Sequence, residues 1–202
     1  MKCKCITMTA FVLASILSFA AAEAQDGKRF DGHWWRSAPY GERRGFLSGY
    51  IDCYKYEFKG RANFSVKSGM ELEELISSFY QANPREILVS RVLYRFRAEP
   101  GERAPEGGEV WEEAHGYYDG IFWKQIDEPR RLGFIEGYLW CYSEKAGNPH
   151  GTFSKDARHY VSLITEWYRL DDNTGDIDPD REEEKIANVL YKFVDQKCEK
   201  GP

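Results

Sequence analysis

Two ten-residue stretches, GFLSGYIDCY at 45–54 and GFIEGYLWCY at 133–142, share the hydrophobic pattern of a buried helix. At 3.6 residues per turn, the glycines and the cysteine of each stretch fall on one narrow stripe with aromatic residues beside it. Apolar residues cover most of the remaining circumference, which is typical of a central helix. We therefore predict central helices over 40–58 and 128–144. The first is expected to turn only Arg44, Ser48, Asp52 and Lys55 toward water.

The internal glycines of these helices call for a packing reason. Each glycine costs a helix about 1 kcal/mol relative to alanine, yet Gly45, Gly49, Gly133 and Gly137 occupy matched places. Small residues at every fourth position allow a second helix to approach closely. We predict a close helix contact, made either with the equivalent helix or with another helix of the same half.

The hydrophobic pattern repeats because the chain contains a tandem duplication. Residues 31–54 align with 119–142 at a constant offset of 88, and ten of these 24 positions are identical. The match continues as LISSFY against LITEWY and as VLYRF against VLYKF, the latter shifted by 97 after an inserted loop. The identical positions of the first copy are Asp31, Gly32, Trp35, Arg43, Gly45, Phe46, Gly49, Tyr50, Cys53 and Tyr54.

Each copy reads as the same helical series. Asp31 and Asp119 can cap a short aromatic helix before the central one. Ser68 and Glu71 form a capping box for a third helix, and Asn83-Pro84 or Asp178-Pro179 can start a fourth. Sustained strand-like alternation is lacking. The predicted fold is all-α, with two tandem copies of a four-helix motif packed as a pseudo-symmetric helical bundle.

The ends of the copies give the domain organisation. Residues 1–24 combine lysines, an apolar run and an Ala-Glu-Ala site, the pattern of a secretory signal peptide. The run is short for a membrane-spanning helix, so cleavage is preferred over a retained anchor. Helical repeat 1 is expected over 31–97, a linker rich in Pro, Gly and Glu over 98–112, and helical repeat 2 over 113–198.

Charge and composition limit the partners. The chain has 28 Lys and Arg against 33 Asp and Glu; without residues 1–24 these become 26 and 32, a formal charge of −6. No basic block is present to hold a phosphate backbone, so nucleic acid is not an expected partner. The predicted location is periplasmic or secreted, without a membrane contact once the signal peptide is removed. The chain is expected to be monomeric or to form homo-oligomers.

Three cysteines remain after processing, Cys53, Cys141 and Cys198. In an oxidising compartment, one disulfide and one free thiol is the natural count. A Cys53–Cys141 bond would join the copies, whereas Cys141–Cys198 would close a loop within the second. A third alternative is that the helical cysteines are small buried apolar residues.

No motif indicates a cofactor or a metal ion. The four histidines, His33, His115, His150 and His159, include no i,i+4 pair and have no counterparts between the copies. The acidic segment 171–180 resembles a calcium loop only in composition, because its glycine is misplaced. It reads as a solvated loop.

One repeated set mixes polar and aromatic groups. Tryptophan beside arginine and aspartate could face a sugar or a peptide. Alternatively, the tryptophan lies in the core and an Arg–Asp pair ties the cap to the next helix, which we prefer because duplicated copies retain fold-determining residues first. These candidate binding residues are Asp31, Trp35, Arg43, Asp119, Trp123 and Arg131.

The order GYIDCY, VKSGMELEELISSFYQANP, VLYRF resembles the Tai-type periplasmic immunity proteins, which neutralise type VI secretion amidase effectors. The resemblance covers about 45–96 and, more loosely, 133–193. Because members of that family are single copies that pair as homodimers, it implies an all-α fold, a periplasmic setting and a fused pseudo-dimer that binds a protein.

Together these features predict an exported, non-catalytic helical binding protein, of the immunity type if the resemblance holds. A cell-wall or carbohydrate-binding module is the first alternative, and it requires exposed tryptophans. A periplasmic hydrolase is the second, and it requires a cleft in which carboxylates converge.

Overall fold

The computed structural model describes residues 29–58, 69–83, 87–96, 118–146, 153–169 and 179–193. Every regular element in these ranges is helical, and the only β pairing among them is an isolated bridge between Asp31 and Leu88. The all-α prediction is therefore confirmed. The predicted signal peptide, the linker over 98–112 and Ser68 lie outside the described residues.

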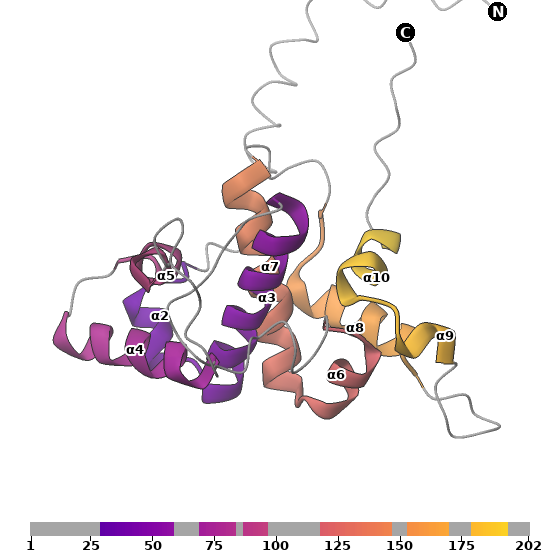
Figure 1. Ribbon diagram of the computed structural model, residues 1–202, viewed down its shortest axis with the longest axis horizontal. Coiled ribbons are helices and arrows are strands. Elements are labelled where there is room, and N and C mark those ends of the chain that lie inside the picture. The colour runs from indigo at the N-terminus through magenta and orange to yellow at the C-terminus, as the bar shows by residue number, and fades with distance from the viewer. Residues whose placement is uncertain are drawn as a thin grey trace, which may run out of the picture.

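Two long helices lie at the centre of the molecule with shorter helices on either side (Figure 1). The central pair is α3, Tyr40–Phe58, and α7, Glu128–Ala146. On one side lie α2 (Gly32–Ser37), α4 (Gly69–Ala82), α5 (Val89–Leu93) and the short 3₁₀ helix η2 (Tyr94–Phe96). On the other side lie α6 (Gly120–Gln125), α8 (Ala157–Trp167), α9 (Pro179–Glu182) and α10 (Ile186–Lys192).

The short aromatic helices begin where the sequence predicts. The Asp31 carboxylate accepts the backbone N–H groups of His33 and Trp34 at 3.0 and 3.3 Å. Asp119 accepts that of Phe122 at 3.0 Å. Each carboxylate satisfies donors that have no partner within the helix. Both predicted caps are confirmed.

The fourth helix of the first half is described only in part, because residues 84–86 lie outside the described residues. The Asn83 side-chain amide donates to the carbonyl oxygen of Phe79 at 2.9 Å, at the end of α4. Helix α5 begins at Val89, whose backbone N–H donates to the Phe30 carbonyl at 2.8 Å. That long-range bond fixes the start of the helix, which a local Asn-Pro motif cannot reveal.

In the second half the predicted start is right but the helix is broken. The short α9 begins at Pro179 and ends at Glu182. A new helix, α10, begins at Ile186, whose backbone N–H donates to the Tyr118 carbonyl at 2.8 Å. Helices α5 and α10 thus begin in the same way, each with a main-chain bond to the segment before the aromatic helix.

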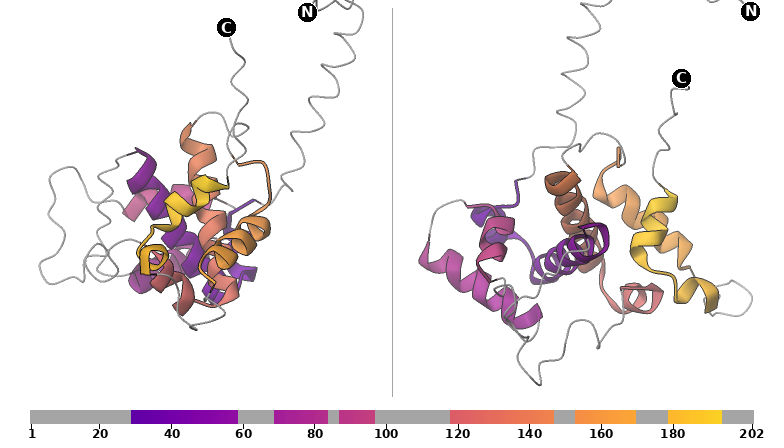
Figure 2. Two further views of the ribbon diagram at one scale, coloured as in Figure 1. Left: turned by 90° about the vertical axis from the view of Figure 1, so that its right-hand side faces the viewer. Right: turned by 45° about the horizontal axis from the view of Figure 1, so that its top comes forward.

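Helices α3 and α7 pack against each other more extensively than any other described pair, and they cross between the two flanking groups (Figure 2, right). A Cβ atom on Gly45 would overlap the Arg130 carbonyl oxygen and lie 2.8 Å from the Phe134 nitrogen. On Gly49 it would overlap the Phe134 carbonyl. The backbones are too close for any side chain there, so the predicted close contact is confirmed.

The same close approach is made from the other helix. A Cβ atom on Gly133 would overlap the Glu42 carbonyl oxygen, and one on Gly137 would overlap that of Phe46. The partner of each glycine-bearing helix is thus the helix that carries the other decapeptide. We call this α3–α7 contact, made by Gly45, Gly49, Gly133 and Gly137, the glycine seam.

One residue predicted to face water is buried. Ser48 is only 1% exposed. Its hydroxyl lowers the pKa of Tyr118 through a hydrogen bond, against the larger effect of burial, which raises that pKa. The expectation failed because the second half covers this side of α3 and supplies a polar partner there.

Candidate functional site

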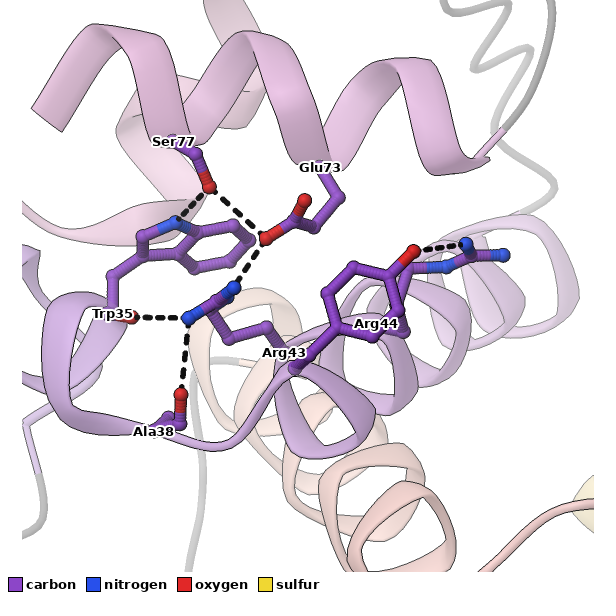
Figure 3. Close-up of polar contacts among 7 residues, drawn as sticks. Trp35, Ala38, Arg43, Arg44, Glu73 and Ser77 are labelled. Carbon is purple, nitrogen blue, oxygen red and sulfur yellow. Dashed lines mark hydrogen bonds and ion pairs between the residues drawn. The ribbon is translucent and has the colours of Figure 1, made fainter. Parts of the chain in front are cut away.

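The first tryptophan–arginine set forms a closed polar network beneath α4 (Figure 3). Trp35 is 1% exposed and donates its indole N–H to the Ser77 hydroxyl at 2.9 Å. That hydroxyl donates to Glu73 Oε1 at 3.0 Å, and Arg43 Nε donates to the same oxygen at 2.8 Å. Glu73 is 4% exposed, so the network contains a buried ion pair.

Arg43 also closes the end of the aromatic helix α2. Its NH1 group donates to the carbonyl oxygens of Ala38 at 3.0 Å and of Trp35 at 3.3 Å (Figure 3). Its guanidinium carbon lies 5.6 Å from the centroid of the Trp35 ring. A basic side chain that binds the last carbonyls of a helix satisfies acceptors that have no partner within it. Arg43 therefore connects the end of α2 to α3 and α4.

The second half repeats the arrangement without the carboxylate. Trp123 is 1% exposed and donates its indole N–H to the Thr165 hydroxyl at 3.1 Å. Arg131 Nε donates to the Trp123 carbonyl at 2.9 Å, and its guanidinium carbon lies 5.6 Å from the Trp123 centroid. Burial is the main cause that lowers the pKa of Arg131. The position that matches Glu73 is Val161.

The aspartates of the candidate set lie apart from the arginines. The predicted Arg–Asp pair is wrong in both halves. Asp31 pairs with Arg29 at 3.2 Å while its other oxygen caps α2. Asp119 caps α6 and forms no ion pair with Arg131 among the described residues. The aspartate oxygens are directed at the start of each aromatic helix and the arginine at its end.

This geometry favours a structural role for the repeated set. Both indole rings are buried, so neither can stack on a sugar without a rearrangement of the fold. Arg43 donates hydrogen bonds to Glu73 and to the Ala38 carbonyl, and Arg131 donates one to the Trp123 carbonyl, so these donors are already used within the protein. Trp35 and Trp123 are therefore core residues whose N–H groups are satisfied internally.

Two members of the network were not identified from the sequence. Glu73 and Ser77 lie on α4 and complete the ring of contacts around Arg43. The repeat alignment contained part of the signal, because it sets Ser77 against the hydroxyl residue Thr165. Glu73 has no acidic counterpart, so the alignment gave no reason to select it.

The cysteine alternatives are resolved by a disulfide between Cys53 and Cys141. The Cα atoms are 6.2 Å apart and both residues are 0% exposed. The bond crosses the glycine seam one turn beyond Gly49 and Gly137. Cys198 lies outside the described residues.

A second polar cluster joins the two halves beyond the disulfide. The Tyr50 hydroxyl donates to Glu144 Oε2, and the Ser90 hydroxyl donates to Glu144 Oε1, both at 2.8 Å. Burial is the main cause that raises the pKa of Tyr50, and Tyr94 and Glu144 add to it. One carboxylate of α7 thus binds α3 and α5 together.

The described part of the chain contains no set of three His, Cys, Asp or Glu residues placed to hold a metal ion. His33 and His159 are both exposed. His115, His150 and residues 171–178 of the acidic segment lie outside the described residues. Within the described ranges, no helix has the length and hydropathy needed to cross a membrane.

No family model, curated protein or solved structure matches the chain.

Proposed function

We propose that the chain is an exported, non-catalytic helical protein that binds a protein partner, as an immunity-type inhibitor of a secreted toxin does. We further propose that its two tandem copies of a four-helix motif pack as a pseudo-symmetric bundle. The protein would act in the periplasm or after secretion, as a covalently fused pseudo-dimer.

The observation that carries the proposal is the disulfide between Cys53 and Cys141. The two cysteines are 88 residues apart, which is the offset of the sequence repeat. In a two-fold interface a residue on the axis meets its own counterpart, so matched cysteines pair with each other. Structural disulfides also persist in oxidising compartments, which supports export.

The glycine seam supports the same pseudo-dimer. In a two-fold interface, if residue i contacts residue j, the counterpart of j contacts the counterpart of i. Gly45 approaches the Arg130 carbonyl and Gly133 approaches the Glu42 carbonyl. With the offset of 88, these contacts exchange into each other. The pairs Gly49–Phe134 and Gly137–Phe46 do the same.

A protein-binding role is preferred over the carbohydrate alternative because of the two repeated tryptophans. A sugar-binding module stacks its ligand on exposed aromatic rings, whereas Trp35 and Trp123 are each 1% exposed. The repeated residues stabilise the fold. The partner-specific residues are then expected among positions that differ between the copies.

The resemblance to Tai-type proteins defines the direct experiment. The product of the gene next to this one would be directed to the periplasm of a host, with and without this chain. We expect growth arrest by the neighbour alone, rescue by the exported chain, and no rescue by a form that lacks residues 1–24. Failure of rescue, together with no complex in gel filtration, would contradict the proposal.

A further inference from the structure

Two arginines, Arg44 and Arg130, lie near each other at the glycine seam, and neither has an ion-pair partner among the described residues. Arg44 precedes Gly45, which packs directly on the backbone of Arg130, so the two side chains start from adjoining turns of α3 and α7. Arg44 extends away from the Glu73 network (Figure 3). Neither guanidinium forms an ion pair with a carboxylate of the described residues, and the Nε–H of each is buried without a hydrogen-bond acceptor.

This pair is unfavourable in the protein alone. Like charges close together repel, and a buried donor without an acceptor loses its hydration without compensation. Burial and then the charge of Arg44 lower the pKa of Arg130. Asp127 lies near, but its Oδ1 accepts the backbone N–H of Arg130 at 3.0 Å and so serves to cap α7. An oxyanion between the guanidinium groups would relieve both costs.

The fold does not require the pair. At the offset of 88, Arg44 matches Leu132, and Arg130 matches Glu42. Glu42 accepts the Trp34 indole N–H at 3.3 Å, and Leu132 is buried. The equivalent place on the other side of the seam thus has one leucine and one satisfied carboxylate. The two arginines are a feature of one side only.

An exposed tyrosine lies at the edge of the pair. Tyr40 is 51% exposed, and its hydroxyl accepts Arg44 NH1 at 2.9 Å. The guanidinium carbons of Arg44 and Arg43 lie 5.8 and 5.9 Å from its ring centroid. Exposed tyrosine beside arginine is the composition of a protein-binding hot spot. The planar fork of arginine also suits a carboxylate, which it can bind through two parallel bonds.

We propose that Arg44 and Arg130 form a carboxylate-binding site that receives an acidic side chain of the protein partner. Tyr40 provides the neighbouring aromatic contact. That the carboxylate comes from a protein partner rests on the proposed function. The arginine site itself belongs to the isolated protein and can be tested without a partner.

Acetate is the probe for the site, with the full processed protein observed by NMR at its arginine Nε–H signals. Sodium acetate replaces sodium chloride at constant ionic strength. We expect the Arg44 and Arg130 signals to shift together and saturably, and that of Arg158, an exposed arginine of α8, to stay in place. A parallel titration uses inorganic phosphate. No saturable shift with acetate, or a shift with phosphate alone, would overturn the carboxylate assignment.

Variants locate the response. Arg44→Leu introduces the residue found at the equivalent position, and should weaken acetate binding by about tenfold or more because a two-arginine site becomes a single one. Arg44→Lys keeps the charge and the fold but loses the fork, and should show an intermediate loss. Arg158→Leu should bind acetate as the wild type does. Equal binding by Arg44→Leu and the wild type would overturn the site.

The two proposals fail separately. A protein that binds acetate at Arg44 and Arg130, but does not neutralise the neighbouring gene product, would keep the site and lose the immunity function. Rescue by the wild type and equally by Arg44→Leu would keep the function and remove this site from the partner contact.

Discussion

We call the sets Trp35, Arg43 and Trp123, Arg131, each with the residues bonded to it, the two tryptophan corners. In both corners the guanidinium carbon lies 5.6 Å from the centroid of the indole ring, although only the first corner contains a carboxylate, Glu73. Arg43 binds Glu73 as well as two carbonyl groups, whereas Arg131 is bonded to main-chain oxygens alone. The geometry shared by both corners is thus the closure of the aromatic helix by arginine. Glu73 occurs in the first half only. Because its buried carboxylate is paired with Arg43, the stability of that half should depend more strongly on its arginine.

Removing the arginine should separate the two corners most strongly. Arg43→Met leaves Glu73 buried with only Ser77 as a donor, and we expect a loss of about 3 kcal/mol or more in the free energy of unfolding. Arg131→Met leaves only carbonyl groups without a donor and should cost about 1–2 kcal/mol. Urea denaturation of both variants measures the difference.

The double variant Arg43→Met/Glu73→Val is the control for that prediction. Because it removes the buried charge together with its partner, it should recover most of the loss. Equal losses for the two single variants would show that Glu73 does not distinguish the corners.

The seam, unlike the corners, should respond equally in both halves. Gly49→Ala and Gly137→Ala each place a Cβ on a backbone carbonyl of the facing helix, so each should cost about 1–3 kcal/mol despite the better helix propensity of alanine. Gly41→Ala, on the same helix as Gly49, meets side-chain atoms of Asp127 and Pro129 at 3.1–3.5 Å and should change stability by less than about 0.5 kcal/mol. Thermal melts that rank Gly41→Ala with the other two would contradict a close seam.

Exchanging the residue that differs should make the corners alike. In Glu73→Val, Arg43 keeps two carbonyl acceptors and remains 20% exposed in its side chain, so the expected loss is about 1 kcal/mol. Val161→Glu places a carboxylate opposite Arg131 and should change stability by less than about 1 kcal/mol. If Val161→Glu has the same effect when Arg131 is methionine, no ion pair has formed there.

A matched pair of tyrosines provides a further comparison of the two halves. Tyr80 donates to the Ile87 carbonyl and Tyr168 to the Glu184 carbonyl, both at 2.6 Å, and burial is the main cause that raises both pKa values. Stability from a raised tyrosine pKa is complete below the unfolded value of about 10 and is lost as the pH rises beyond it, because the unfolded chain ionises first. Tyr80→Phe and Tyr168→Phe should each cost about 1 kcal/mol at neutral pH and reduce the alkaline loss. Urea unfolding at pH 7 and above pH 10 tests this prediction. A loss of stability in only one of the two variants would contradict the expected equivalence of Tyr80 and Tyr168.

The features that the sequence predicts are those with a local or repeated signal. The start of α7 at Glu128, the bounds of α3 and the two aspartate caps follow from periodicity and capping chemistry. The glycine seam was predictable because four internal glycines at matched places require a close contact. The identity of the two helices that meet there was not predictable, since small residues on one helix do not specify which helix approaches it.

The features that escaped prediction depend on residues far apart in the chain. The start of α5 is set by a bond from Val89 to Phe30, and the burial of Ser48 by Tyr118. Glu73 is a single residue on α4 without a counterpart, so neither pattern nor repeat selects it. The sequence did not decide the cysteine pairing, because three cysteines allow several disulfides. Only the packing of α3 on α7 selects the bond between Cys53 and Cys141.

The pairing of the cysteines is the most direct test of the fused pseudo-dimer, because Cys53 and Cys141 belong to the two repeated decapeptides. Trypsin should release each cysteine in its own peptide, at 45–55, 132–145 and 198–200. Mass spectrometry of the non-reduced exported protein should find 45–55 linked to 132–145, and 198–200 as a free thiol. A link between 132–145 and 198–200 would place the second cysteine within its own half and contradict the fused pseudo-dimer.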